Sequence, residues 1–180
     1  ILNIKYPIKF NMTDDEISTF ADNFYINTFC LYNDRKIYRK YFSKKKEFRI
    51  HWIKSPNINQ KNLNSILTRS IQEEDDVIII CFDNYRFKTN YSKYSLFKYI
   101  LMAKFYQADI LFGNGSEMDC MCKIQDELYW VNSIKKSNFI VLYRKFFNKI
   151  LDINSLNSKS FPETISALSH DKLMINDMSI

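Results

Sequence analysis

A single carboxylate, Asp83, directly follows the most apolar run of the chain, residues 77–82. The run is rich in β-branched residues, which predicts a strand buried on both faces. Arg86 follows shortly after. Ligands of open α/β sheets bind outside the carboxyl ends of the strands, so Asp83 and Arg86 are candidates for a binding site. A carboxylate there can ligate a divalent cation, and a guanidinium can bind phosphate oxygens.

The segments around this run alternate between helix and strand. Helical spacing over residues 62–71 precedes the run, a second helix is expected over 96–105, and a short apolar strand over 108–112. This alternation predicts an α/β fold with a mostly parallel central sheet flanked by helices. We expect one such domain over residues 1–180, because no repeat or boundary interrupts the pattern.

The rest of the chain adds further elements to this plan. Thr13 and Glu16 have the spacing of a capping box and predict a helix start. The only two glycines, Gly113 and Gly115, predict a turn after the second strand. The remaining expected elements are strands over 26–31, 47–53, 127–132 and 138–143, and helices over 34–46, over 144–151 and from Pro162 towards Met174.

Composition limits the class of protein. The chain has 180 residues, of which 46% are hydrophobic, enough for a core. No apolar run approaches the roughly 20 residues that span a bilayer, so no transmembrane segment is expected. The four cysteines lack the spacing of a disulfide framework or a zinc site, which favours a reducing, cytoplasmic location. A net charge of +6 is compatible with a phosphate-bearing partner.

The order of parts over residues 60–180 resembles the glycosyltransferase domain of the lysyl hydroxylase and procollagen galactosyltransferase group, which has a nucleotide-diphosphosugar transferase fold. Asp83 matches the first of that family's two metal-binding aspartates, and Arg86 stands in place of the second. Residues 110–117 are similar to its acidic turn. Asn132 with Ser133 is similar to its Asn-Ser-Gly-Gly-Phe segment, and residues 169–174, with Asp171, to its Asp-Asp-Gln-Leu-Phe segment.

The resemblance implies sugar transfer from a nucleotide-sugar donor. In that reading Asp83 holds Mn²⁺ or Mg²⁺ at the donor diphosphate, Asn132 contacts the donor sugar, and Asp171 is the catalytic residue. The sequence departs from the family at Arg86 and in the missing glycines after Asn132. Either Arg86 binds the diphosphate directly in place of the metal, or the catalytic site has been lost and the fold serves another purpose.

A basic cluster suggests a different function. Seven cations interleaved with tyrosines lie within twelve residues: Arg35, Lys36, Arg39, Lys40, Lys44, Lys45 and Lys46. Lysine and arginine neutralise phosphates and aromatic rings stack on bases, so this cluster predicts a non-catalytic module that binds RNA or a ribonucleoprotein such as the ribosome. The other interpretation is a solvated helix face whose lysine stems cover the core. A second basic group, Lys135 and Lys136 with Arg144, Lys145 and Lys149, could extend the surface. An unrelated α/β domain with another ligand is a third possibility.

Overall fold

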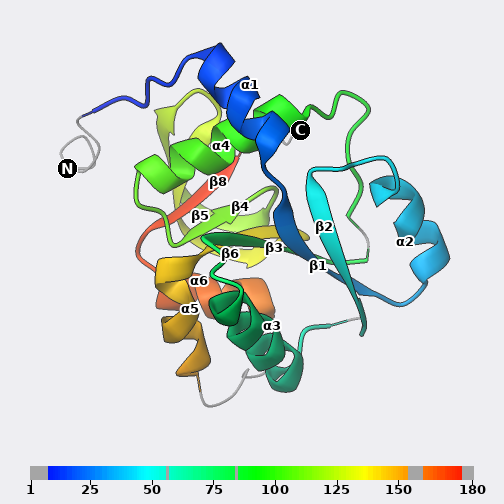
Figure 1. Ribbon diagram of the computed structural model, residues 1–180. Helices are drawn as coiled ribbons and strands as arrows, with labels where there is room; N and C mark the ends of the chain where they lie inside the picture. The colour runs from blue at the N-terminus through cyan, green and yellow to red at the C-terminus, as the bar shows by residue number, and fades with distance from the viewer. Residues whose placement is uncertain (1–7, 56, 84, 154–159, 176–180) are drawn as a thin grey trace.

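The computed structural model describes residues 8–55, 57–83, 85–153 and 160–175, without the side chains of 35–38. Within these residues the strands form one eight-stranded sheet. Their order is β2-β1-β3-β7-β4-β8-β6-β5 (Figure 1). The strands are β1 Ile26–Tyr32, β2 Phe48–Lys54, β3 Val77–Cys81, β4 Ile110–Phe112, β5 Ser116–Gln125, β6 Leu128–Lys136, β7 Phe139–Tyr143 and β8 Lys172–Ile175.

Helices cover both faces of the sheet, which confirms the α/β class. One face carries α1, α2 and α4, and the other carries α3, α5 and α6 (Figure 1). The helices are α1 Asp14–Asn23, α2 Arg35–Phe42, α3 Gln60–Gln72, α4 Lys93–Phe105, α5 Arg144–Leu151 and α6 Phe161–Leu168. In the described part of the chain, no helix has the length and apolar character needed to cross a membrane.

The central strand β3 is buried on both faces, as its apolar run predicts. Ile79 and Cys81 point into the core beneath α1, α2 and α4, whereas Ile78 and Ile80 point into the core beneath α3, α5 and α6. All four residues are fully buried. Successive side chains of a strand point to opposite faces, so a strand with helices on both sides needs an unbroken apolar run.

The sheet is mixed, not strictly parallel. Strand β1 pairs in parallel with β2 and β3, and β4 pairs in parallel with β8. Strand β7 lies antiparallel between β3 and β4, and β6 is antiparallel to both β5 and β8. The expectation of a mostly parallel sheet is therefore corrected to a mixed sheet. A strand buried on both faces has the same apolar composition in either direction, so its composition could not predict the direction of β7.

Two strands were not expected from the sequence. Strand β5 is exposed over most of its length, Met118 and Met121 included, because it is the edge strand and β6 is its neighbour in the sheet order. Strand β8 replaces the end of the helix expected to run from Pro162 towards Met174. That helix stops at Leu168, and the hydroxyl of Ser169 then accepts the Asp171 N–H at 3.1 Å and donates to Asp109 at 2.8 Å.

Candidate functional site

A cleft of about 1030 Å³ opens at the carboxyl ends of β1, β3 and β4. Asn33 follows β1, Asp83 lies just beyond β3, and Asn114 follows β4, so each strand delivers a polar side chain to the same edge. Asn138 reaches the cleft from the start of the antiparallel β7. The full lining is Asn33, Asn57, Ile58, Phe82, Asp83, Arg86, Asn114, Gly115, Ser116, Lys135, Lys136, Ser137, Asn138, Ser160, Phe161 and Pro162.

Asp83 is half-buried in the cleft wall and joins the ends of two strands. Its Oδ2 accepts the backbone N–H of Asn33 at 3.0 Å, which ties the end of β3 to the end of β1. Asp83 thus lies just beyond the carboxyl end of β3, where the sequence places it, and its role in ligand binding stays a prediction. One carboxylate oxygen is already engaged by the protein, so Asp83 also has a structural role in shaping the cleft.

Arg86 is held in the same wall by contacts to both backbone and ring. Its Nη1 donates to the carbonyl oxygens of Asp83 and Tyr85, each at 3.1 Å. The centre of its guanidinium lies 4.5 Å from the centroid of the Tyr41 ring on α2, a cation–π distance. These contacts hold the Arg86 side chain beside Asp83, so both residues line the same cleft.

The loop that carries Arg86 is anchored by an aromatic cluster. The ring of Phe87 packs against Phe42 of α2 and Phe48 of β2, with centroids 4.9 and 5.4 Å apart. Tyr91 donates a hydrogen bond to the buried Glu47. Burial, together with this carboxylate, raises the pKa of Tyr91 far above its ordinary value. The anchored loop gives Arg86 a defined position without a helix or strand of its own.

Lys135 and Lys136, at the end of β6, bring two more cations to the cleft. Both pair with Glu117 of β5: Lys136 Nζ contacts Oε1, and Lys135 Nζ lies 3.8 Å from Oε2. The two ammonium groups hold the pKa of Glu117 below its usual range, the Lys136 hydrogen bond being the larger cause. All three side chains are well exposed, so the pairing is weak and open to exchange with a ligand.

The residues present do not fit the divalent cation that the resemblance implies. Among the described residues that line the cleft, Asp83 is the only carboxylate, and it is accompanied by Arg86 and the two lysines. Within the described ranges, no group of three or more histidine, cysteine or acidic side chains could hold a metal. Mg²⁺ and Mn²⁺ prefer several oxygen ligands, and nearby cations oppose their binding electrostatically.

The other two residues of the transferase interpretation do not line the cleft. Asn132 is exposed on β6, where its Nδ2 donates to Oδ2 of Asp119 at 3.3 Å. Asp171 precedes β8, and its carbonyl accepts the Asp109 N–H at 2.7 Å. Because β4 and β8 are parallel, Asp109 and Asp171 lie at their amino ends, whereas the cleft lies at the carboxyl end of β4. The structure therefore separates Asp171 from Asp83.

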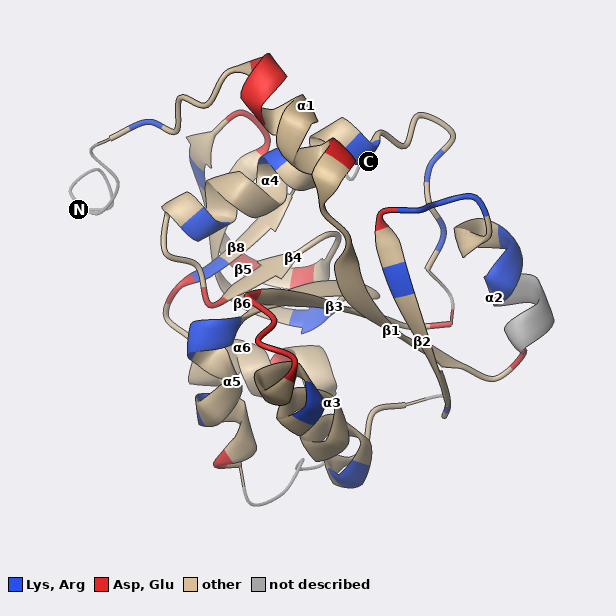
Figure 2. Cartoon of the chain, in the orientation of Figure 1, with Lys and Arg blue, Asp and Glu red and all other residues tan. Residues whose placement is uncertain are grey.

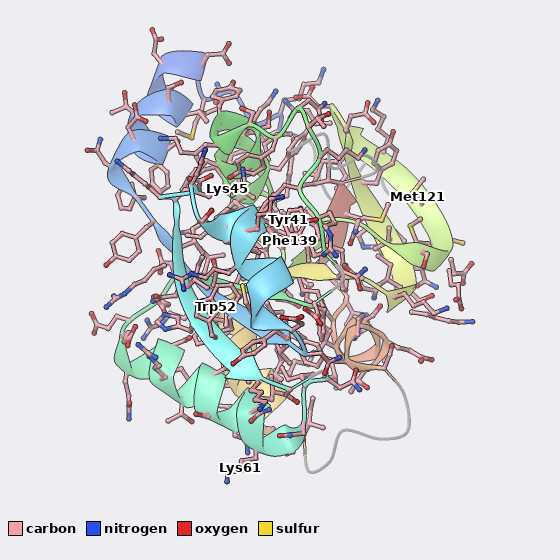
Figure 3. The ribbon with its side chains drawn as sticks, turned by 90° about the vertical axis from the view of Figure 1, so that its right-hand side faces the viewer. Tyr41, Lys45, Trp52, Lys61, Met121 and Phe139 are labelled. Atoms are coloured by element: carbon pink, nitrogen blue, oxygen red, sulfur yellow. The ribbon has the colours of Figure 1, made fainter. Side chains whose placement is uncertain are left out.

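The basic cluster has members in different environments. Arg39, Lys40, Lys44 and Lys46 are exposed on α2 and the turn after it, and Figure 2 shows this basic stretch leading into β2. Lys45, which is labelled in Figure 3, is half-buried. Its Nζ lies 3.5 Å from the Tyr91 ring centroid and 4.6 Å from that of Phe87. Burial lowers the pKa of Lys45. The side chains of Arg35 and Lys36 lie outside the described residues.

The second basic group does not extend that surface as one patch. Lys135 and Lys136 line the cleft, which lies at the amino end of β7. Arg144, Lys145 and Lys149 lie on α5, which begins at the other end of that strand.

The cleft also contains polar residues that were not predicted from the sequence: Asn33, Asn57, Asn114, Ser116, Ser137, Asn138 and Ser160. Most of them lie next to the end of a strand. The rule that ligands of open α/β sheets bind beyond the strand ends could therefore have selected them.

Comparison with known proteins supports the fold. No family model matches the sequence, and no curated protein matches it. In structure, the chain is similar to the crystal structure of apo UDP-glucose pyrophosphorylase, with a TM-score of 0.50 and 10% identity. The match covers 96% of this chain and 78% of that chain. The protein therefore has a fold like that of a nucleotide-sugar enzyme. At this identity the likeness extends to the fold alone, and it does not single out the lysyl hydroxylase group.

Proposed function

We propose that the cleft binds a nucleotide sugar and that the domain transfers the sugar from this donor. The observation that carries the proposal is the convergence of Asp83, Arg86 and the Lys135–Lys136 pair on one cleft at the carboxyl ends of β1, β3 and β4. Cations suit a diphosphate, and the asparagine and serine side chains around them suit sugar hydroxyls. The likeness to a protein named for UDP-glucose supports the same ligand class.

A role for each residue follows from its position. Arg86 is proposed to bind a phosphate through the guanidinium edge that faces away from its two carbonyl partners. Asp83 is proposed to hold the strand ends in register and to accept a donor hydroxyl through its other oxygen. Asn132 and Asp171, which the resemblance associates with the sugars, are not assigned contacts here because they lie away from the cleft lining.

Thermal unfolding with UDP-sugars tests the proposal. A nucleotide sugar at about ten times its Kd is expected to stabilise the fold by about 1.4 kcal/mol, which raises the Tm by about 3–6 °C. Arg86→Gln should abolish this shift at the same ligand concentration. Asp171→Asn is the matched control and should leave the shift intact. Release of UDP during incubation, measured by chromatography, then distinguishes transfer or hydrolysis from binding alone. No shift with any nucleotide sugar would contradict the proposal.

A second candidate function rests on the exposed cations of α2. Arg39 and Lys40 lie in the last turn of the helix, and Lys44 and Lys46 follow it, all accessible to a phosphate backbone. This surface supports the proposal of an RNA or ribonucleoprotein partner. Lys45 is not included, because its ammonium group lies over the rings of Tyr91 and Phe87. The two functions use different surfaces, so they can be tested separately.

A further inference from the structure

The charges of the cleft define how a nucleotide sugar would be held there. The diphosphate of such a ligand carries negative charge on each phosphate, and this charge must be neutralised where the ligand binds. The described part of the cleft lining offers three cationic side chains and a single carboxylate, Asp83. This balance suits a bare anion better than an anion already paired with a divalent cation.

The three cations come from two separate parts of the fold. Arg86 is fixed by Tyr41 and by the carbonyl oxygens of Asp83 and Tyr85. Lys135 and Lys136 come from the end of β6, next to Ser137 and Asn138, which lead into β7. A diphosphate in the cleft would be offered the planar guanidinium fork of Arg86 and the flexible ammonium groups of Lys135 and Lys136.

Glu117 supplies the anion that these lysines contact in the structure. It contacts both ammonium groups from β5, with Oε2 3.8 Å from Lys135 Nζ and Oε1 in contact with Lys136 Nζ. The backbone of Glu117 has φ of 55°, a left-handed conformation that is uncommon outside glycine. Its neighbours Ser116 and Met118 pair with Lys136 and Ile134, so the strand pairing of β5 and β6 places the carboxylate beside the lysines.

We propose that Arg86, Lys135 and Lys136 bind the diphosphate without a divalent cation, and that the Glu117 carboxylate is an internal counter-ion that the ligand displaces. This inference rests on the proposed function and specifies its chemistry. The ligand class is a nucleoside diphosphate or its sugar ester. Binding exchanges the two exposed lysine–carboxylate contacts for contacts between the same lysines and phosphate oxygens.

Calorimetric titration with UDP, in EDTA and then in Mg²⁺ or Mn²⁺, tests the metal independence. The affinity in EDTA is expected to equal that with metal. Arg86→Gln should weaken binding at least about ten-fold, since a charge-assisted bond to phosphate is lost. Arg86→Lys should recover only part of the loss, because it keeps the charge without the fork. Arg49→Gln, on the exposed start of β2, is the matched control and should leave the affinity unchanged.

Glu117→Gln separates the proposed counter-ion from a merely structural residue. Removing its charge should tighten UDP binding by about two- to five-fold in EDTA, because the lysines are freed. Lys136→Gln should weaken binding, and in that background the gain from Glu117→Gln should shrink. Circular dichroism confirms that each variant is folded.

The outcomes distinguish this inference from the proposed function. Binding only with Mg²⁺ or Mn²⁺ would overturn metal independence and leave the nucleotide-sugar function in place. No binding of UDP or UDP-sugars under either condition would overturn both. Equal or weaker binding by the Glu117→Gln variant would overturn the counter-ion role.

Discussion

Arg86 is the residue whose position in the structure is the most informative. It lies where the resemblance places a second metal-binding aspartate, and the structure holds its guanidinium against Tyr41 and two carbonyl oxygens. A side chain fixed in this way presents a positive charge at a constant place in the cleft. Its chemistry therefore favours direct binding of an anion over binding of a metal ion.

Lys45 leads to a prediction at the same scale. Its stem and ammonium group pack on Tyr91 and Phe87, whereas the adjacent Lys44 is exposed. Lys45→Ala is expected to lower the free energy of unfolding by about 1 kcal/mol through lost packing and cation–π attraction. Lys44→Ala should change it by less than about 0.5 kcal/mol. Urea denaturation measures both, and equal effects of the two substitutions would show that Lys45 is a solvated side chain.

At the scale of elements, the turn between β4 and β5 depends on a close approach at Gly115. A Cβ atom at this position would lie 2.7 Å from Cδ1 of Ile134 on β6 and 3.2 Å from the sulfur of Met174 on β8. Both neighbours are buried. The glycine thus lets the cleft wall pack directly on the two strands, a role that its place in a turn does not by itself reveal.

Gly115→Ala is expected to destabilise the protein by about 1–3 kcal/mol, because the added methyl group overpacks the site. Ile134→Val removes the Cδ1 atom in closest contact, and alone should cost about 0.5–1.5 kcal/mol. In the double variant the cost of Ala at 115 should fall by at least about 0.5 kcal/mol. Chemical denaturation of the four proteins in this cycle provides the measurement. Strictly additive costs would mean that Ile134 is not the obstacle.

At the scale of the whole molecule, the chain has a net charge of +6, and its cationic side chains lie on several surfaces. One group of cations lines the cleft, and the exposed cations of α2 and its following turn lie beside β2 (Figure 2). Helices α3 and α5 lie on the other face of the sheet and carry Lys61 and Lys149. This separation allows a charge-matched comparison of the two faces.

If RNA binds the α2 surface, Arg39→Glu with Lys40→Glu should weaken that binding and lower the slope of log K against log salt by about 0.7 per lost phosphate contact. Lys61→Glu with Lys149→Glu changes the net charge equally on the other face and should have a much smaller effect. Filter binding of single-stranded RNA at several salt concentrations measures both. Equal losses in the two double variants would indicate binding driven by net charge, without a defined surface.

Several features of the protein were predictable from local sequence. The capping box is present, with the Thr13 N–H donating to Glu16 Oε2 at 2.7 Å and the Glu16 N–H donating to Thr13 Oγ1 at 3.3 Å. The buried strand was predicted from its apolar run, and the position of Asp83 at the cleft from its place after that strand. Each of these depends on residues close together along the chain, where spacing and side-chain type determine the geometry.

Only the tertiary structure determined which distant residues share the cleft. In the structure β7 runs antiparallel to its neighbours, where a mostly parallel sheet was expected. Asp171 lies at the amino end of β8, whereas Asp83 lies at the carboxyl end of β3. Lys135 and Lys136 line the same cleft as Arg86. The tertiary structure also placed the half-buried Lys45 over the Tyr91 ring, whereas its neighbours Lys44 and Lys46 are exposed. Strand direction, strand order and the partners of a side chain result from contacts between segments far apart in the sequence. Periodicity describes only which face of an element is apolar, and it is the same for several arrangements of those elements.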